Sequence, residues 1–214
     1  MERCKEYFIS KNASHLVERI REFDGSSATV ELAAVRFNCN PAQIAKSLTF
    51  HQRKAMSKAE AKAHQRTLQK TQRQQQPDEG SDGVSASGAT TGTPPDSNVV
   101  MIVVAGDAKV NTTKFKGKFF SPPRMLKHED VEALTGHPPG GVCPFGVREG
   151  VRVFLDVSLR RFETVYPAAG TANSGLELSV DELETYASNL VEWVDVCEGW
   201  LPEGAGAAAG VTDA

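Results

Sequence analysis

Apolar residues at helical spacing open the chain. Residues 4–23 carry an apolar stripe that predicts one amphipathic helix, formed by Phe8, Leu16, Val17 and Ile20. The stretch SSATVELAAVRF (26–37) predicts a second, short helix, because its Ser and Thr suit N-caps and its alanines allow close packing. Residues 40–43, Asn-Pro-Ala-Gln, predict a compact helix start with Asn as the N-cap, proline at the first helical position and Gln at the third.

Several short strands are predicted further along. AKSLTF (45–50) is one, and the wholly apolar run VVMIVVA (99–105) before Gly106 is typical of a central strand. VRVFLDVSL (151–159) and RFETVYPAAG (161–170) predict two more, whereas KVNTTKFKGKF (109–119) is interpreted as loop and strand edge.

Two helices are predicted among these strands. HEDVEALTG (128–136) is a short helix that ends at Gly136. A capping box at 179–182 opens a last helix, whose apolar stripe consists of Leu183, Tyr186, Leu190, Trp193 and Val194. Strands with helices around them predict a single α+β domain.

Composition divides the chain into parts. Residues 51–76 favour helix by propensity but lack an apolar face, and 77–98 are low-complexity, which predicts disorder. We therefore interpret 1–25 as an N-terminal helix, 26–200 as the domain, 51–98 as an insertion in it, and 201–214 as a flexible tail.

The net charge of −3 conceals a strong asymmetry. Basic residues dominate 51–76 and 109–127, whereas the segment after Gly175 contains acids and no Lys or Arg. Two basic stretches in an acidic chain fit contact with a polyanion such as RNA, although a solvated helix face and a lysine-rich loop explain the same pattern.

The four cysteines are Cys4, Cys39, Cys143 and Cys197, with no CxxC pair, which predicts reduced thiols and a cytoplasmic protein.

We expect no membrane segment, because no apolar run is long enough, and no cofactor. We also predict no metal site, because the ligand spacing of zinc proteins is missing; Cys143 with His128 or His137 stays open as an alternative. Cys143 with His137 could also form a thiol–imidazole dyad, but nothing in the sequence places the imidazole on the sulfur, so we interpret Cys143 as a small buried apolar residue that lines the loop.

The stretch TGHPPGGVCPFG (135–146) predicts a rigid backbone cradle. Glycine permits turn angles that point successive N–H groups into one concavity, and proline holds the exit. Such a concavity binds an anion or a carbonyl oxygen and can stabilise an oxyanion. The candidate binding residues are Gly140, Gly141, Val142, Cys143 and Pro144.

Two charged residues lie on predicted strands. Lys46 shares a strand face with Leu48 and Phe50, so its ammonium either reaches solvent or meets a partner. Asp156 ends an apolar strand, where its carboxylate could accept hydrogen bonds from the cradle, from a ligand amine, or from a local turn.

Taken together and in order, the motifs IAKSLTF, VVMIVVAGDAKV, LTGHPPGGVCPFG, FLDVSL and AAGT resemble the YbaK/ProX family of aminoacyl-tRNA editing domains, which includes the editing domain inserted in bacterial prolyl-tRNA synthetases. The resemblance covers about 26–50 and 98–197. It implies a central mixed, partly barrel-like sheet flanked by helices. It also implies an essential lysine at Lys46, a GxxxP loop from Gly140 to Pro144, and a family aspartate at Asp156. The insertion 51–98 departs from the family pattern, and it either grips tRNA or is a neutral expansion.

The resemblance implies a trans-acting deacylase that removes a mischarged small amino acid, of the alanine or cysteine class, from tRNA, most often tRNA(Pro). Its partners would be aminoacyl-tRNA and, as a further candidate, prolyl-tRNA synthetase. An aminoacyl ester is already activated, so positioning and charge stabilisation can supply most of the rate. The alternatives are a non-catalytic module that binds tRNA or a synthetase, and a small-ligand-binding protein.

Overall fold

The structure is a computed structural model that describes residues 1–52 and 99–200. These belong to one compact unit built from Met1–Arg53 with Ser97–Ala214. The predictions for the insertion from residue 53 onward and for the tail lie outside the described residues.

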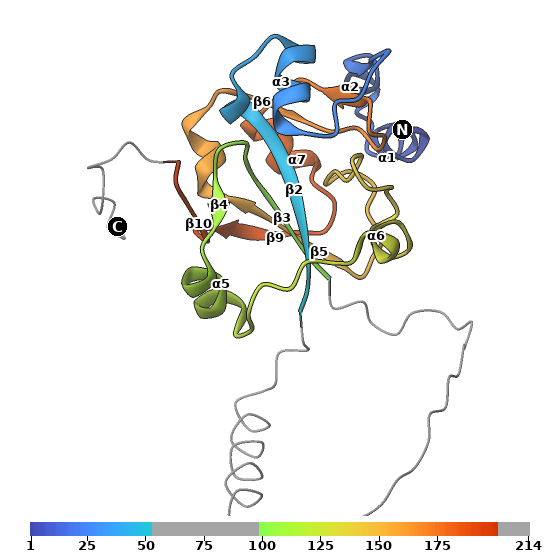
Figure 1. The fold of residues 1–214 in the computed structure, drawn as a ribbon. Coiled ribbons are helices and arrows are strands. Elements are labelled where there is room, and N and C mark those ends of the chain that lie inside the picture. Colours follow the sequence, from blue (N-terminus) through green and yellow to red (C-terminus); the bar gives the residue numbers. More distant parts are fainter. Residues whose placement is uncertain (53–98, 201–214) are drawn as a thin grey trace, which may run out of the picture. The chain divides into compact units, whose positions relative to one another are not determined.

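The described part alternates short helices and strands along its whole length (Figure 1). The helices are α1 (Glu2–Ser10), α2 (Ser14–Val17), α3 (Val30–Phe37), α5 (Thr112–Phe119), α6 (His128–Thr135) and α7 (Val180–Tyr186), with 3-10 turns η1 (Pro41–Gln43) and η2 (Val157–Arg161). The strands are β1 (Ile20–Glu22), β2 (Ile44–His51), β3 (Val99–Ala105), β4 (Lys109–Val110), β5 (Val151–Asp156), β6 (Thr164–Pro167), β7 (Ser174–Leu176), β8 (Leu178–Ser179), β9 (Leu190–Val194) and β10 (Cys197–Glu198).

A six-stranded mixed sheet in the order β8-β6-β2-β3-β5-β9 forms the centre of the fold. Strands β2 and β3 pair antiparallel, with Lys46 opposite Val104, while β2–β6, β3–β5 and β5–β9 pair in parallel. Two small sheets, β1–β7 and β10–β4, complete it. The expected α+β class with a mixed, partly barrel-like sheet is confirmed.

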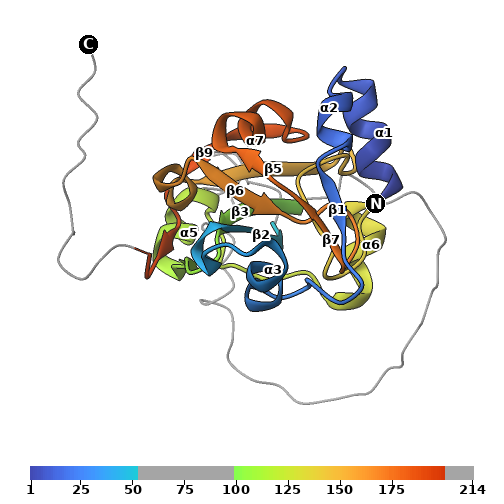
Figure 2. The ribbon, with the colours of Figure 1, turned by 90° about the horizontal axis from the view of Figure 1, so that it is seen from above.

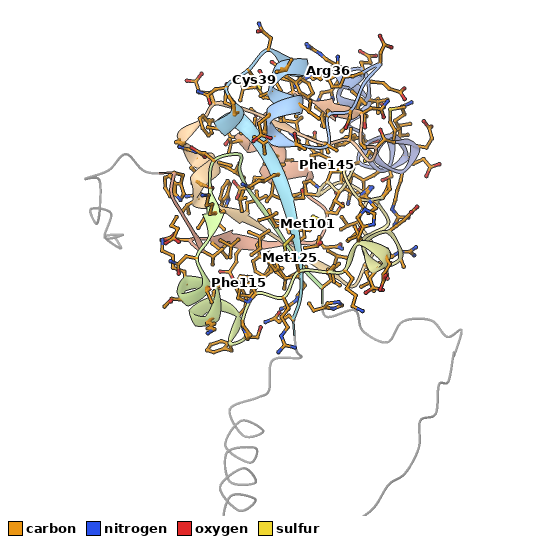
Figure 3. The ribbon with its side chains drawn as sticks, viewed as in Figure 1. Arg36, Cys39, Met101, Phe115, Met125 and Phe145 are labelled. Carbon is orange, nitrogen blue, oxygen red and sulfur yellow. The ribbon has the colours of Figure 1, made fainter. Side chains whose placement is uncertain are left out.

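Strand β3 is the middle of the core, because all seven of its residues are buried. Met101, labelled in Figure 3, is fully buried on this strand. Helices cover the sheet from more than one side, and Figure 2 shows α3 and α7 on opposite sides of β2, β3 and β6. A strand covered on both faces needs the continuous apolar sequence that 99–105 has.

Several sequence predictions are confirmed in detail. Thr29 caps α3 by accepting a hydrogen bond from the Leu32 N–H, and Asn40 and Gln43 form the predicted capping box around η1. Gly136 ends α6 in the left-handed conformation, and Ser179 with Glu182 forms the second capping box.

Five predicted elements are wrong in extent or type. The strand expected over 161–170 covers only Thr164–Pro167, as β6. The helix over 4–23 breaks into α1, α2 and β1, since Asn12 adopts a positive φ of 57° between the two helices. Residues 112–119 form α5 rather than loop, because Asn111 accepts hydrogen bonds from the N–H groups of Thr113 and Lys114. The last helix stops at Tyr186, so Leu190, Trp193 and Val194 lie on β9. Strand β5 ends at Asp156, and η2 follows it.

In the described ranges, no helix has the length and apolar character needed to cross a membrane.

Candidate active site

Lys46 lies on the central strand pair. The capping box at 40–43 fixes the start of β2, and pairing with β3 on one side and β6 on the other fixes its course. The half-buried Lys46 donates a hydrogen bond of 2.9 Å from Nζ to the Gly106 carbonyl oxygen, just beyond the end of β3. The ammonium is therefore held at a defined point above the strand ends.

Gly106 makes this contact possible through a close approach of two backbones. A Cβ at residue 106 would lie 1.9 Å from the Pro41 carbonyl oxygen, and the Gly106 N–H donates to the Ala42 carbonyl at 3.1 Å. Only glycine fits against η1 at this distance. The carbonyl that accepts the Lys46 hydrogen bond is therefore positioned by a residue that must be glycine.

The surroundings of Lys46 lower the pKa of its ammonium from the ordinary lysine value. Burial is the largest cause, and the cation Lys109 acts in the same direction. The acidic groups of Asp107 and Glu31 act against this shift, as does the Cys197 thiol. Lys46 is a cation that is partly removed from water and retains hydrogen-bonding capacity for a ligand.

The glycine loop, residues 140–144, packs against the segment that follows β6. Gly140 has a φ of +84°, and a Cβ there would meet the Ala28 and Ala172 methyl groups at 3.0 Å. At Gly141 a Cβ would lie 2.5 Å from the Thr171 backbone nitrogen. Both glycines are therefore required by conformation or by space, as a rigid cradle demands.

The loop amides are used unequally. The Gly141 N–H closes a turn by donating to the Pro138 carbonyl at 3.0 Å. Among the described residues, the N–H groups of Gly140 and Val142 have no hydrogen-bond acceptor, and both residues line a cavity that Lys46 also lines. These two amides are the donors that the loop can offer to a ligand.

Lys46 and the glycine loop face the same cavity, which has a volume of about 280 Å³. Its walls come from β2, from α3 with the residues before it, from the glycine loop, and from β6 with the residues after it. Many lining side chains are small: Ser27, Ala28, Ala33, Ala45, Ser47, Ala168 and Ser174. A lysine and two loop residues with unused backbone N–H groups therefore line one compact cavity.

A second, more open hollow of about 390 Å³ adjoins the first and shares Lys46 and Leu48 with it. Its wall is mostly apolar and includes Phe50, Val110 and Met125, with Lys109 as a further cation. Met125 is 62 % exposed and is labelled in Figure 3. Since Lys46, Leu48 and Phe50 all line this hollow, their predicted common strand face is confirmed.

Cys143 and Pro144 lie behind the cavity wall. Cys143 is fully buried, as predicted, and its Sγ lies 3.7 Å from His137 Nε2. Burial raises the pKa of the Cys143 thiol well above its ordinary value, so this residue is a poor nucleophile and the dyad does not reach the cavity. The Pro144 carbonyl accepts a hydrogen bond from the Ser188 N–H at 2.7 Å, which fixes the loop exit.

Asp156 is buried at the end of β5, and it does not line the cavity. One carboxylate oxygen accepts from the Ser158 N–H and the other from the Val196 N–H, both at 3.0 Å. The sequence left three hydrogen-bond donors open for Asp156: the cradle, a ligand amine or a local turn. The structure shows the local turn, through Ser158, and a second bond to Val196 beyond β9.

The sequence did not indicate the contribution of α3 and Ser47. Residues Val30, Ala33 and Phe37 of α3 line the cavity, although this helix was predicted without reference to a site. Ser47 lines it too, and its buried hydroxyl has no partner within the described residues. The signal that identifies Ser47 is this buried hydroxyl without a partner beside Lys46, and only the structure shows it.

The basic stretch 109–127 is partly neutralised by acids. Lys114, Lys118 and Lys127 pair with Asp195, Glu192 and Glu129. Lys109, Lys116 and Arg124 are exposed and have no acidic partner within 4 Å in residues 1–52 and 99–200. The surplus of positive charge is therefore smaller than the sequence suggests, and Lys109 brings part of it to the second hollow.

Comparison with known proteins identifies relatives over most of the chain. A family model of the aminoacyl-tRNA editing domain matches residues 93–186. The uncharacterized protein YwhH of Bacillus subtilis (strain 168) is 37% identical over 181 residues, which cover 85% of this chain and 88% of that protein. A proline–tRNA ligase of Pelobacter propionicus is 29% identical over 92 residues, which are 42% of this chain and 14% of the ligase.

A solved structure of a candidate trans-editing enzyme for prolyl-tRNA synthetase has the same fold. It superposes with a TM-score of 0.64 over 92% of this chain and 96% of the other, at 21% identity. The resemblance found in the sequence is thereby confirmed. The chain belongs to the family of aminoacyl-tRNA editing domains.

Proposed function

We propose that this protein is a trans-acting deacylase that hydrolyses a mischarged small amino acid, of the alanine or cysteine class, from tRNA(Pro). One observation carries the proposal: Lys46, Gly140 and Val142 line one small cavity, and the N–H groups of the last two have no acceptor among the described residues. The family of the chain supports an aminoacyl-tRNA as the substrate. The similarity to a proline–tRNA ligase supports tRNA(Pro) as the tRNA. Aminoacyl-tRNA is the proposed partner, and prolyl-tRNA synthetase is a further one.

The reaction needs no protein nucleophile. Water attacks the ester carbonyl, the carbonyl oxygen gains negative charge, and collapse releases the amino acid and the 3′-terminal ribose hydroxyl. The Gly140 and Val142 N–H groups would donate to the developing oxyanion, and Lys46 would hold the ester or the adjacent ribose and phosphate. The small cavity would hold the amino acid and reject larger ones as a second sieve.

The second hollow suits the end of the tRNA. With the aminoacyl group in the first cavity, the ester would lie beside Lys46, which lines both hollows. The terminal nucleoside would then contact the apolar wall around Phe50 and Met125. Lys109 at this wall would face the neighbouring phosphates. Asp156 would act as a positioning residue, because its carboxylate fixes the chain after β5 and β9.

The test is single-turnover hydrolysis of tRNA(Pro) charged with alanine, cysteine, serine or proline. We expect rapid loss of one small non-cognate amino acid and survival of prolyl-tRNA. If every ester survives while charged tRNA still binds, the protein is a docking module and the deacylase proposal fails. If no tRNA binds at any salt concentration, the deacylase and the docking module are both wrong, and the protein binds a small ligand instead.

A further inference from the structure

A second cluster of reactive side chains lies behind the glycine loop. Cys4 of α1, His137 after α6 and Cys143 of the loop place their three ligand atoms within 4.8 Å of one another. The two sulfurs are 3.3 Å apart, and Cys143 Sγ is 3.7 Å from His137 Nε2. All three side chains are buried, and none lines the cavity that Lys46 shares with Gly140 and Val142. The cluster is therefore separate from the proposed deacylase site.

A fourth donor completes the group. The Phe145 carbonyl oxygen lies 2.8 Å from His137 Nε2, 3.8 Å from Cys4 Sγ and 3.9 Å from Cys143 Sγ. In a tetrahedral zinc site with bonds of about 2.3 Å to sulfur and 2.0–2.1 Å to nitrogen, neighbouring donors are roughly 3.3–3.8 Å apart. Most of these separations already lie close to that range, so four donors from three parts of the chain surround one point.

The charges of this donor set suit a divalent ion in an apolar interior. Two thiolates neutralise Zn²⁺, so the filled site carries no net charge, whereas a lone thiolate there would be costly. His137 would bind the ion through a neutral imidazole nitrogen, the form in which histidine binds zinc. On binding, two thiol protons pass to solvent, and the imidazole proton moves from Nε2 to Nδ1, so that the hydrogen bond to Phe145 is exchanged for coordination.

We propose that Cys4, His137 and Cys143, with the Phe145 carbonyl oxygen, form a structural zinc site. Three side-chain ligands with the carbonyl oxygen as the fourth would leave no open position, so the site would be closed like a structural zinc site, with a backbone oxygen where those sites have a fourth Cys or His. The ion would join α1 to the glycine loop, beside Phe145, which is labelled in Figure 3. The Phe8 and Phe145 rings contact each other there, with centroids 4.9 Å apart. The proposal departs from the sequence prediction of no metal site, which is untested, because the sequence could not show that Cys4 lies beside Cys143.

The neighbouring thiols offer one other chemistry. A Cys4–Cys143 disulfide would bring the sulfurs to about 2.05 Å, with loss of two electrons to an oxidant such as peroxide. That reaction makes no use of His137 or the Phe145 carbonyl. The convergence of all four donors favours the metal.

The experiment uses the full chain, because the site joins α1 to residues 137–145, which lie far apart in the sequence. Protein is unfolded with a chelator and a thiol reductant, then refolded with Zn²⁺, with Co²⁺ or without metal, and freed of unbound metal. We expect about one zinc per chain and, with cobalt, the visible and near-ultraviolet bands of tetrahedral thiolate coordination. Cys4→Ser and Cys143→Ser should lose the cobalt bands and at least about tenfold in zinc affinity, whereas Cys39→Ser, at a half-buried thiol elsewhere, should keep both.

The wild-type result decides even where a variant fails to fold. Folded wild-type protein that holds less than about a tenth of an equivalent of zinc, and gives no tetrahedral cobalt spectrum, would overturn the proposal. A metal-free Cys4–Cys143 disulfide found by mass spectrometry in protein purified without reductant would overturn it too. Neither readout depends on deacylation, so this proposal and the proposed function stand or fall separately.

Discussion

At the residue scale, the position of the Lys46 ammonium depends on a residue that has no side chain. Gly106 presents its carbonyl to Lys46 because its backbone lies against Pro41. The sequence singled out Lys46 through its strand and its family motif. It could not single out Gly106, because the approach of the chain after β3 to η1 joins segments more than sixty residues apart.

Gly106→Ala should therefore damage both stability and the site. The added methyl would meet the Pro41 carbonyl, so we expect a loss of about 1–3 kcal/mol in the free energy of unfolding. Chemical denaturation measures this loss. Gly117→Ala is the matched control, because a Cβ there meets nothing within 4 Å in the described structure. Equal stability of the two variants would show that the close approach does not exist.

The lowered pKa of Lys46 predicts a pH dependence of ligand binding. An amine is charged below its pKa, so a depressed value means that the positive charge is lost at lower pH than in an exposed lysine. Affinity for a non-hydrolysable 3′-aminoacyl-amide analogue of the tRNA end should fall as the pH rises through that value. An amide analogue is required, because aminoacyl esters hydrolyse in base.

The matched variant is Lys46→Arg, whose guanidinium stays charged at alkaline pH. Its affinity should persist to higher pH than that of the wild type. If both proteins lose affinity at the same pH, another group titrates and the role given to Lys46 is wrong.

At the element scale, the sequence predicted strands better than the ends of helices. Strand β3 is readable because a strand buried on both faces is apolar throughout. Helix α5 was missed because its polar residues outnumber its core residues, Phe115 and Phe119, so it shows little periodicity. The last apolar stripe was assigned to one helix because Leu190, Trp193 and Val194 continue its spacing, although Asn189 turns the chain into β9 with a φ of 50°.

The glycine loop was recognised as a cradle, but its supports were not. Ser188 holds the loop exit from a segment more than forty residues away: its N–H donates to the Pro144 carbonyl, and its hydroxyl accepts from the Gly146 N–H at 2.7 Å. Nothing in TGHPPGGVCPFG indicates this partner. Contacts between distant segments are what pattern analysis of one sequence cannot supply.

Ser188→Ala should loosen the loop without altering the cavity wall. The Gly146 N–H would lose its acceptor, which costs about 1 kcal/mol or more in the free energy of unfolding. Thermal unfolding should detect the loss, and single-turnover hydrolysis should slow. Ser10→Ala removes an exposed hydroxyl bond on α1 and should change neither. A Ser188→Ala protein with wild-type stability would contradict the bracing role.

At the scale of the whole molecule, the N-terminal segment is part of the site's foundation. Arg3 donates from Nε to the Gly146 carbonyl, and Cys4 touches Cys143. The sequence assigned residues 1–25 to a separate helix outside the family resemblance, because no local pattern shows where a helix packs. The structure places α1 directly behind the glycine loop.

The charges around the second hollow should govern tRNA affinity. Lys109→Gln removes a cation beside that hollow, so we expect weaker tRNA binding and a shallower dependence of log K on log salt, by about one phosphate contact. Titrations at several salt concentrations measure the slope. Lys11→Gln, a matched change at the residue that follows α1, away from the hollow, should leave the slope unchanged. The same slope in Lys109→Gln and wild type would remove the second hollow from the tRNA path.

The most direct test of the central claim compares the wild type with Lys46→Ala and Lys118→Ala in single-turnover deacylation of the ester that the wild type hydrolyses best. Lys118 is a surface lysine paired with Glu192, so its loss controls for a missing positive charge. The account predicts a fall of at least about 100-fold for Lys46→Ala and a near wild-type rate for Lys118→Ala, with all three proteins folded. A folded Lys46→Ala protein that hydrolyses the ester at the wild-type rate would contradict it.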